Sequence, residues 1–209
     1  MAEPRPAALP PAERTVGQLI AESVRFYGEH FWAVLVLGIP FAGVDAAGIG
    51  RSIAVQTLLV WAFAPLLCAS YVRASQLVTG GRPTWDAYLA ALVIFLPVPI
   101  LVRIYVLPAV AWFGLVGLAV PAAVAERRGF RSALRRGREL GRADLVHAIG
   151  GMAALALVYG VCRGFLLVLL HTQGDQEQAI AYVLADLVLS PLLFVGGALL
   201  YLDQAARVK

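Results

Sequence analysis

Long apolar runs alternate with short polar, glycine-containing or basic segments along this chain of 209 residues. Crossing the hydrocarbon core of a bilayer takes about 20 helical residues, and about six of the runs are long enough. Their approximate ranges are 31–49, 52–72, 85–102, 104–125, 145–170 and 178–202. The pattern therefore predicts an all-α fold, an integral membrane helical bundle of about six transmembrane helices.

Proline occurs in every predicted span except 145–170. Broken helices line the binding sites of many transporters, but proline is also tolerated in membrane helices, and we favour simple tolerance. The stretch 97–108 is rich in proline and contains Arg103. It fits either a turn between separate third and fourth spans or a single re-entrant segment.

Two further segments show apolar positions at helical spacing opposite charged ones, which is typical of helices that lie on a membrane surface. The first covers 15–29 and opens with a capping-box pattern of Thr15 and Gln18. Its apolar stripe consists of Val16, Leu19, Ile20, Val24 and Tyr27. The second covers 129–142, with an apolar face of Phe130, Ala133, Leu134, Gly137 and Leu140.

The second segment is strongly basic, and its arginines are Arg131, Arg135, Arg136, Arg138 and Arg142. Arginines near a membrane surface are attracted to anionic headgroups by about 1 kcal/mol each. These arginines could enforce topology alone, bind lipid headgroups, or dock a protein partner. Nucleic acid is not an expected partner, because no DNA-binding fold surrounds the patch.

Composition and charge agree with this picture, since 60% of the residues are hydrophobic and 14% are charged. With the N-terminus inside, all basic residues except Arg51, Arg103 and Arg163 fall on the cytoplasmic side. This asymmetry predicts that both termini are cytoplasmic. Every basic residue except Lys209 is an arginine, a bias that indicates a GC-rich bacterial genome and hence the bacterial plasma membrane.

The remaining sequence is expected to form one membrane domain, 14–209, after a short leader. Residues 1–13 contain four prolines and are predicted to be disordered. The first thirty residues lack the continuous apolar core and cleavage site of a signal peptide, so the first span is expected to direct insertion.

Charged residues within the predicted spans are costly and usually paired or functional. Arg163 and Asp186 lie at similar distances along the chain from the loop between the last two spans. We therefore predict that they form an ion pair, and we place Asp45 near Arg103 or Arg51 toward the outer surface. A static pair that specifies packing is the favoured interpretation; a substrate or proton pathway is the alternative.

No arrangement of residues indicates catalysis. His30, His147 and His171 are scattered, and the sequence has no HExxH, GxSxG or paired-carboxylate pattern. Cys68 and Cys162 both lie within apolar runs, where a thiol usually behaves as a small hydrophobic side chain. We therefore expect no enzyme activity, no cofactor and no metal site.

Three stretches together resemble a known family: RTVGQLIAESVRFYGEHFW (14–32), LAVPAAVAERRGFRSALRRGREL (118–140) and ALLYLDQAARVK (198–209). They are similar to the bacterial glycerophosphoryl diester phosphodiesterase membrane-domain family. Gly137 stands where that pattern has serine. The family takes its name from fusion to a separate catalytic barrel, which this chain lacks, so the resemblance implies topology and lipid association but no activity.

The expected function is that of a non-catalytic multi-pass membrane protein that associates with anionic lipids or supports another membrane component. A membrane protein partner or a second copy of the chain would fit the same reading. The alternative is a small transporter or permease subunit that uses Asp45, Arg103, Arg163 and Asp186 in a cavity. An aqueous cavity reaching Asp186 would favour transport, and a dry core would favour the first reading.

Overall fold

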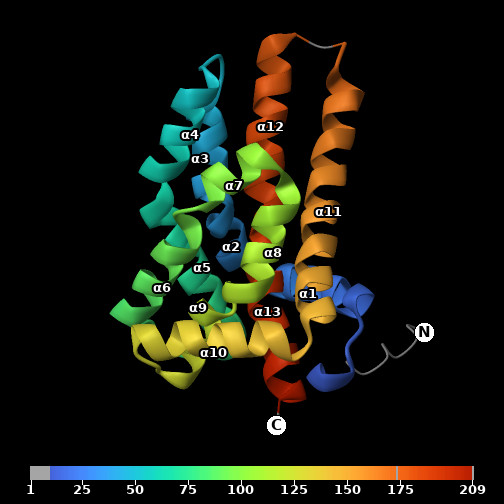
Figure 1. Cartoon of the computed structure of the whole chain (residues 1–209). Coiled ribbons are helices and arrows are strands. Elements are labelled where there is room, and N and C mark those ends of the chain that lie inside the picture. Colours follow the sequence, from blue (N-terminus) through green and yellow to red (C-terminus); the bar gives the residue numbers. More distant parts are fainter. Residues whose placement is uncertain (1–9, 173, 209) are drawn as a thin grey trace, which may run out of the picture.

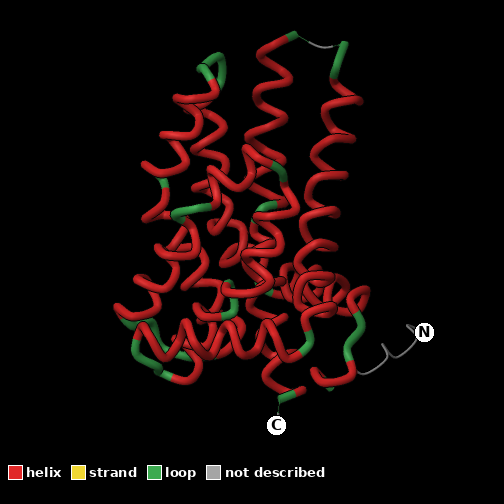
Figure 2. The backbone as a smooth tube through the Cα atoms, viewed as in Figure 1, coloured by secondary structure: helices red, strands yellow, loops and turns green. Residues whose placement is uncertain are grey.

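The computed structural model describes residues 10–172 and 174–208, which form helices and no strands (Figures 1 and 2). The first half of the chain forms η1 (Pro11–Glu13), α1 (Val16–Glu29), α2 (Phe31–Leu35), η2 (Val36–Gly38), α3 (Ile39–Gly48), α4 (Ile53–Ala62), α5 (Ala64–Thr79), α6 (Trp85–Phe95) and α7 (Val98–Ile104). The second half forms α8 (Val106–Val116), α9 (Ala119–Glu126), α10 (Phe130–Ala143), α11 (Leu145–Leu170), α12 (Asp175–Leu189) and α13 (Pro191–Arg207).

These helices combine into membrane spans close to the predicted ranges. Segments long and apolar enough to cross a bilayer are Phe31–Gly48, Trp85–Ile104, Val106–Glu126, Leu145–Leu170 and Gln176–Arg207. The pair α4 and α5, bent by 51°, forms a sixth when counted as one broken span. The chain is therefore an all-α membrane protein. The third and fourth spans are separate, because Tyr105 has an extended backbone (φ −170°) that ends α7 before α8 begins.

Most breaks within the spans coincide with prolines. Pro40, Pro65, Pro99 and Pro191 each occupy the first turn of the helix that follows a break. Proline is favoured there because it has no N–H, and the first N–H groups of a helix have no partner within that helix. The proline-free span, α11, is one continuous helix of 26 residues. Proline thus accounts for four of the interruptions, whereas the break between α8 and α9 falls at Gly117 and Leu118.

The bundle has two distinct ends (Figure 1). We call the end with α10 and the C-terminal end of α13 the basal end, and the opposite end, with the α3–α4 and α11–α12 connections, the apical end. Helix α10 lies across the direction of the spans at the basal end, and α1 also lies there. The α7–α8 turn stops short of the other apical turns, so the bundle is lower on that side.

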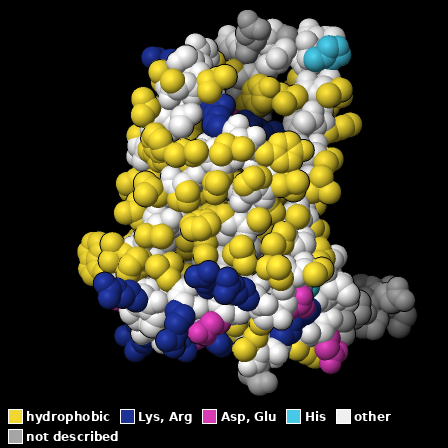
Figure 3. Space-filling model, viewed as in Figure 1, with side chains coloured by type: hydrophobic (Ala, Val, Ile, Leu, Met, Phe, Trp, Pro, Cys, Tyr) yellow, Lys and Arg dark blue, Asp and Glu magenta, His cyan; other side chains and the backbone are white. Residues whose placement is uncertain are grey.

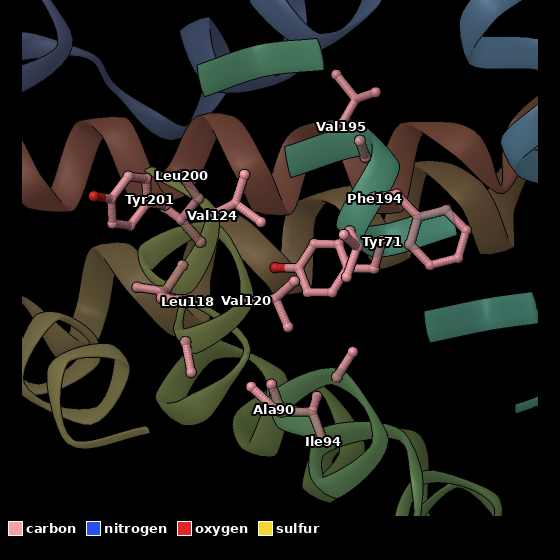
Figure 4. Packing of buried hydrophobic residues seen from close by; sticks show 14 of the residues in the cluster. Tyr71, Ala90, Ile94, Leu118, Val120, Val124, Phe194, Val195, Leu200 and Tyr201 are labelled. Atoms are coloured by element: carbon pink, nitrogen blue, oxygen red, sulfur yellow. The ribbon is translucent and has the colours of Figure 1, made fainter. Parts of the chain in front are cut away.

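The core lies in the basal half, where α5, α6, α9 and α13 meet (Figure 4). Tyr71 of α5, Ile94 of α6, Val124 of α9 and Leu200 of α13 are all fully or almost fully buried there. The Tyr71 hydroxyl also donates a hydrogen bond to the Gly117 carbonyl, at 3.0 Å. A packed basal core thus holds the crosswise helices in place.

The N-terminal region differs in part from the prediction. Thr15 and Gln18 form the expected capping box at the start of α1. The buried face of α1 runs through Leu19, Ser23 and Tyr27, whereas Val24 is exposed. Of the leader expected to be disordered, residues 1–9 lie outside the described part, but Pro11–Glu13 form a helical turn against α13.

Some glycines of the bundle lie at close helix contacts, and others do not. A Cβ atom at Gly137 of α10 would lie 2.7 Å from Cα of Ala119, which leaves no room for a side chain. This explains physically why the serine of the family pattern would not fit position 137. A Cβ atom at Gly160 or Gly164 would meet no heavy atom within 4 Å.

The contrast between these glycines makes a first prediction. We expect Gly137→Ala to lower the free energy of unfolding by about 1–3 kcal/mol, because the new methyl group meets the backbone of α9. The same change at Gly160 should be neutral or stabilise by up to about 1 kcal/mol, since alanine favours helix over glycine. Titration with sodium dodecyl sulfate, followed by circular dichroism, measures both. Equal effects at the two positions would contradict the close packing of α10 on α9.

Candidate functional site

The charges within the spans form a cluster, called here the apical charge cluster, which consists of Asp45, Arg163 and Asp186. The Nε of Arg163 lies 3.2 Å from Oδ1 of Asp186, so the predicted ion pair between the last two spans is present. The Nη2 of the same guanidinium is paired with Asp45 of α3. One arginine therefore connects α3, α11 and α12.

Two tyrosines complete this cluster. The Tyr159 hydroxyl donates a hydrogen bond of 2.6 Å to Oδ1 of Asp186. The guanidinium of Arg163 lies 5.2 Å from the ring centroid of Tyr182, within the range of a cation–π contact. Sequence reasoning missed both tyrosines, although each lies four residues before a charged member of the cluster on its own helix, and so on the same helix face. Asp186 itself is buried, with 1% of its surface exposed.

The sequence places Asp45 near Arg103 or Arg51, and the structure shows which residue is its ion-pair partner. Asp45 pairs with Arg163 rather than with Arg103 or Arg51, because α3 packs against α12 beside α11. Arg51 is exposed at the α3–α4 turn. Arg103 instead donates long hydrogen bonds to neutral acceptors on α4, including Oγ1 of Thr57 at 3.3 Å and Oε1 of Gln56 at 3.4 Å.

A cavity of about 460 Å³, the apical cavity, opens beside the charge cluster. Asp45, Arg103 and Arg163 line it, and Asp186 does not. Figure 3 shows Lys or Arg atoms set within a hollow in the apical half of the molecule. The cavity thus reaches the apical side of the charge cluster. The buried carboxylate of Asp186 lies on the basal side and does not line the cavity.

The basal end presents the basic helix that the sequence predicts. Helix α10 buries Ala133, Gly137 and Leu140 against α8 and α9, and its arginines project from the remaining faces. Two of them have carboxylate partners within the chain: Arg135 pairs with Glu139 at 3.3 Å, and Arg136 with Glu126 at 3.4 Å. The structure gives no ion pair, among the residues it describes, for Arg131, Arg138 and Arg142.

A crevice of about 300 Å³ lies where α6, α8 and α10 meet. Val93 and Trp112 form part of its apolar lining, and Arg135 and Arg138 are the charged residues that line it. The Trp112 indole N–H donates to the Ile94 carbonyl at 3.0 Å, which fixes α8 against α6. Figure 3 shows a band of Lys and Arg side chains across the basal end, below a belt of hydrophobic side chains.

Sequence reasoning also missed a buried polar network at the basal end. Asp203, with no exposed surface, accepts a hydrogen bond of 3.1 Å from Arg14, and Nε2 of His147 lies 3.7 Å away. The Arg207 guanidinium pairs with Asp144 and donates to the Arg14 carbonyl at 2.7 Å. The backbone N–H of His147, together with Arg207, holds the pKa of the Asp144 carboxyl below its usual value.

The three stretches that carry the family resemblance meet in this network. Arg14 of the first stretch pairs with Asp203 of the third. Tyr201, also of the third, donates a hydrogen bond of 2.8 Å to Glu126 of the second. Glu126 in turn pairs with Arg136. These contacts join the three stretches and fix α1, α10 and α13 together.

Comparison with protein-family models, with curated proteins and with solved structures gives no match to this chain. Over residues 10–172 and 174–208, no group of three or more His, Cys, Asp or Glu side chains is placed to hold a metal ion. Both cysteines are free thiols, with Cys68 buried and Cys162 exposed.

Proposed function

We propose that this chain is a non-catalytic, multi-pass protein of the bacterial plasma membrane that binds anionic phospholipid at its basal end. The basal end faces the cytoplasm in this proposal, because the arginines of α10 gather there and basic residues are retained on that side of the membrane. The supporting observation is the crevice between α6, α8 and α10, which combines an apolar wall with Arg135 and Arg138.

The crevice has the two chemistries that a phospholipid requires. Val93, Trp112 and Val116 offer an apolar surface for an acyl chain. The guanidinium groups of Arg135 and Arg138 would bind the phosphate, because arginine matches phosphate geometry with paired N–H donors. A lipid in this position would have its headgroup at the cytoplasmic surface and its chain along α6 and α8.

The ion pairs also separate the arginines by role. Arg136 is held by Glu126 and fixes α10 to the end of α9, so we assign it to structure rather than to the headgroup. Arg135 is highly exposed, and its pair with Glu139 is of the exposed kind that contributes little to stability. It is therefore free to exchange that carboxylate for a phosphate.

We expect Arg135→Gln combined with Arg138→Gln to weaken binding of phosphatidylglycerol roughly tenfold or more, since each arginine near the surface contributes about 1 kcal/mol. Native mass spectrometry of the detergent-solubilised protein, titrated with phosphatidylglycerol or phosphatidylcholine, measures this. The matched control is Arg131→Gln combined with Arg142→Gln, which removes the same charge from α10 outside the crevice.

Three outcomes decide the lipid proposal. Loss of binding in the Arg135→Gln, Arg138→Gln variant alone supports a lipid site in the crevice. Val93→Phe, which fills the crevice without changing its charge, should weaken binding too. Equal loss in both variants would mean that α10 attracts lipid by diffuse charge without a site. Equal affinity of the wild-type protein for phosphatidylglycerol and phosphatidylcholine would overturn the proposal.

A small transporter or permease subunit is the second candidate function, and the apical cavity favours it. A solute entering there would meet Arg163 and then Asp186, which is buried and bound by Tyr159. Transport would therefore need a second state in which Arg163 and Asp186 separate. Solute flux into proteoliposomes that Asp186→Asn abolishes, with stability unchanged, would move transport to first place.

A further inference from the structure

The apical cavity contains two groups of opposite charge, Asp45 and Arg103, that are not paired with each other. Asp45 lies on α3 with about a quarter of its side chain exposed, 24%, and Arg103 lies on α7. Both line the cavity. A ligand that enters would therefore meet a carboxylate from α3 and a guanidinium from α7.

Of the two arginines in the cavity, Arg103 is the one available to an anion. Arg163 is already engaged by Asp45, Asp186 and the Tyr182 ring. Arg103 is bonded to neutral acceptors only, among the residues that the structure describes, and those bonds measure 3.3–3.4 Å. Its charge is thus held in position by α4 without being neutralised by an adjacent carboxylate.

The charge balance of the region selects the kind of ligand. Asp45, Asp186, Arg103 and Arg163 together are neutral when all four are ionised. Adding a net charge to a cavity with low-dielectric walls is costly unless the charge is paired. A zwitterion adds none, and each of its ends can meet an opposite charge. The anionic end would meet Arg103, and the cationic end would meet the exposed part of the Asp45 carboxylate, which it would share with Arg163.

We propose that the apical cavity binds a small zwitterion that carries an ammonium group and a phosphate or carboxylate. The volume of about 460 Å³ is within the usual range for small-molecule sites. Val44, Val60 and Ala179 add apolar surface for a short carbon chain between the two charged ends. The ligand is either a soluble zwitterion or the headgroup of a lipid such as phosphatidylethanolamine from the apical leaflet. This site is separate from the basal crevice and does not depend on it.

The first test uses the full chain in nanodiscs of phosphatidylglycerol and isothermal titration calorimetry. We expect glycerophosphoethanolamine to bind, and glycerol 3-phosphate and ethanolamine, which each carry one of its two charges, to bind at least about tenfold more weakly. Arg103→Gln and Ala179→Leu should each reduce the affinity for glycerophosphoethanolamine at least about tenfold, the first by removing the anion partner and the second by filling the cavity.

The matched control is Arg51→Gln, which removes an apical arginine that does not line the cavity and should leave binding unchanged. Melting temperatures show that each variant is folded, and Arg103→Gln breaks no ion pair that the structure contains. Arg135→Gln with Arg138→Gln should also leave this binding unchanged, so a failure here and a failure of the lipid proposal are distinguishable.

A second arm identifies the source of the ligand. Nanodiscs that contain phosphatidylethanolamine should weaken binding of the soluble compound if the lipid headgroup occupies the cavity, and leave it unchanged if the ligand is soluble. Glycerol 3-phosphate could bind as tightly as glycerophosphoethanolamine, with an affinity that Asp45→Asn does not change. That result would overturn the zwitterion proposal in favour of an anion site. The zwitterion proposal would be overturned entirely if none of the three soluble compounds bound and if Arg103→Gln did not change the binding of phosphatidylethanolamine.

Discussion

Arg163→Leu is expected to lower the free energy of unfolding by about 3–5 kcal/mol, the cost of removing one partner from a buried ion pair. The substitution would leave Asp45 and the buried Asp186 without their cation. Three helices, α3, α11 and α12, would lose their common contact. Titration with sodium dodecyl sulfate, followed by circular dichroism or tryptophan fluorescence, measures the loss.

A triple variant distinguishes the loss of the ion-pair attraction from the cost of leaving two carboxylates without a cation. Arg163→Leu combined with Asp45→Asn and Asp186→Asn should recover a large part of the stability, because neutral replacements of a buried ion pair are often tolerated. Arg103→Leu is the control for removing a cavity arginine with no ion pair, and its effect should be small. A single Arg163→Leu variant as stable as the wild-type protein would show that this cluster does not hold the bundle.

Asp203→Ala should have the next largest effect, a loss of about 3 kcal/mol or more, because Asp203 is fully buried and pairs with Arg14. The change would remove this carboxylate from the Arg14 guanidinium, and the Arg14 side chain is only 11% exposed to water. It would also release the segment around η1 from α13. Trypsin provides a second measurement, since cleavage after Arg14 should become faster along with the drop in stability.

The control for Asp203→Ala is Glu139→Ala, which breaks an exposed pair with Arg135. Exposed pairs of this i,i+4 kind contribute about 0.3–0.5 kcal/mol, so Glu139→Ala should change neither stability nor the rate of cleavage noticeably. Unchanged cleavage after Arg14 in the Asp203→Ala variant would show that other contacts hold the N-terminal segment.

The spans and the crosswise helices could be predicted because their signals are local. A span requires a run of apolar residues, and α10 requires a helical repeat of apolar and basic positions, both of which a single stretch of sequence contains. Most of the breaks also follow from local chemistry, because proline has no N–H to continue a helix. The arrangement of α10 across the basal end follows from its single apolar face.

The pairing of the charged side chains could be predicted only where the chain itself limits the choice. Arg163 and Asp186 lie on consecutive spans joined by a short connection, so similar depth was enough to pair them. Asp45 lies on the first span, and its contact with Arg163 depends on how α3 packs against α12, which no local pattern determines. Arg14 and Asp203 are 189 positions apart. Arg14 precedes the predicted surface helix and Asp203 follows the last predicted span, and charged residues at both places are expected in water.

The unequal heights of the spans have a consequence for the surrounding bilayer. Helix α11, with 26 residues, is about 39 Å long, whereas the 21 residues from Val106 to Glu126 cover about 31 Å at most. Lipids beside α7 and α8 therefore meet a lower hydrophobic wall than lipids beside α11. A bilayer adapts to such mismatch by thinning locally, at a fraction of a kcal/mol per Å. The apical leaflet should dip over this side, bringing water and headgroups down to the rim of the cavity at Arg103.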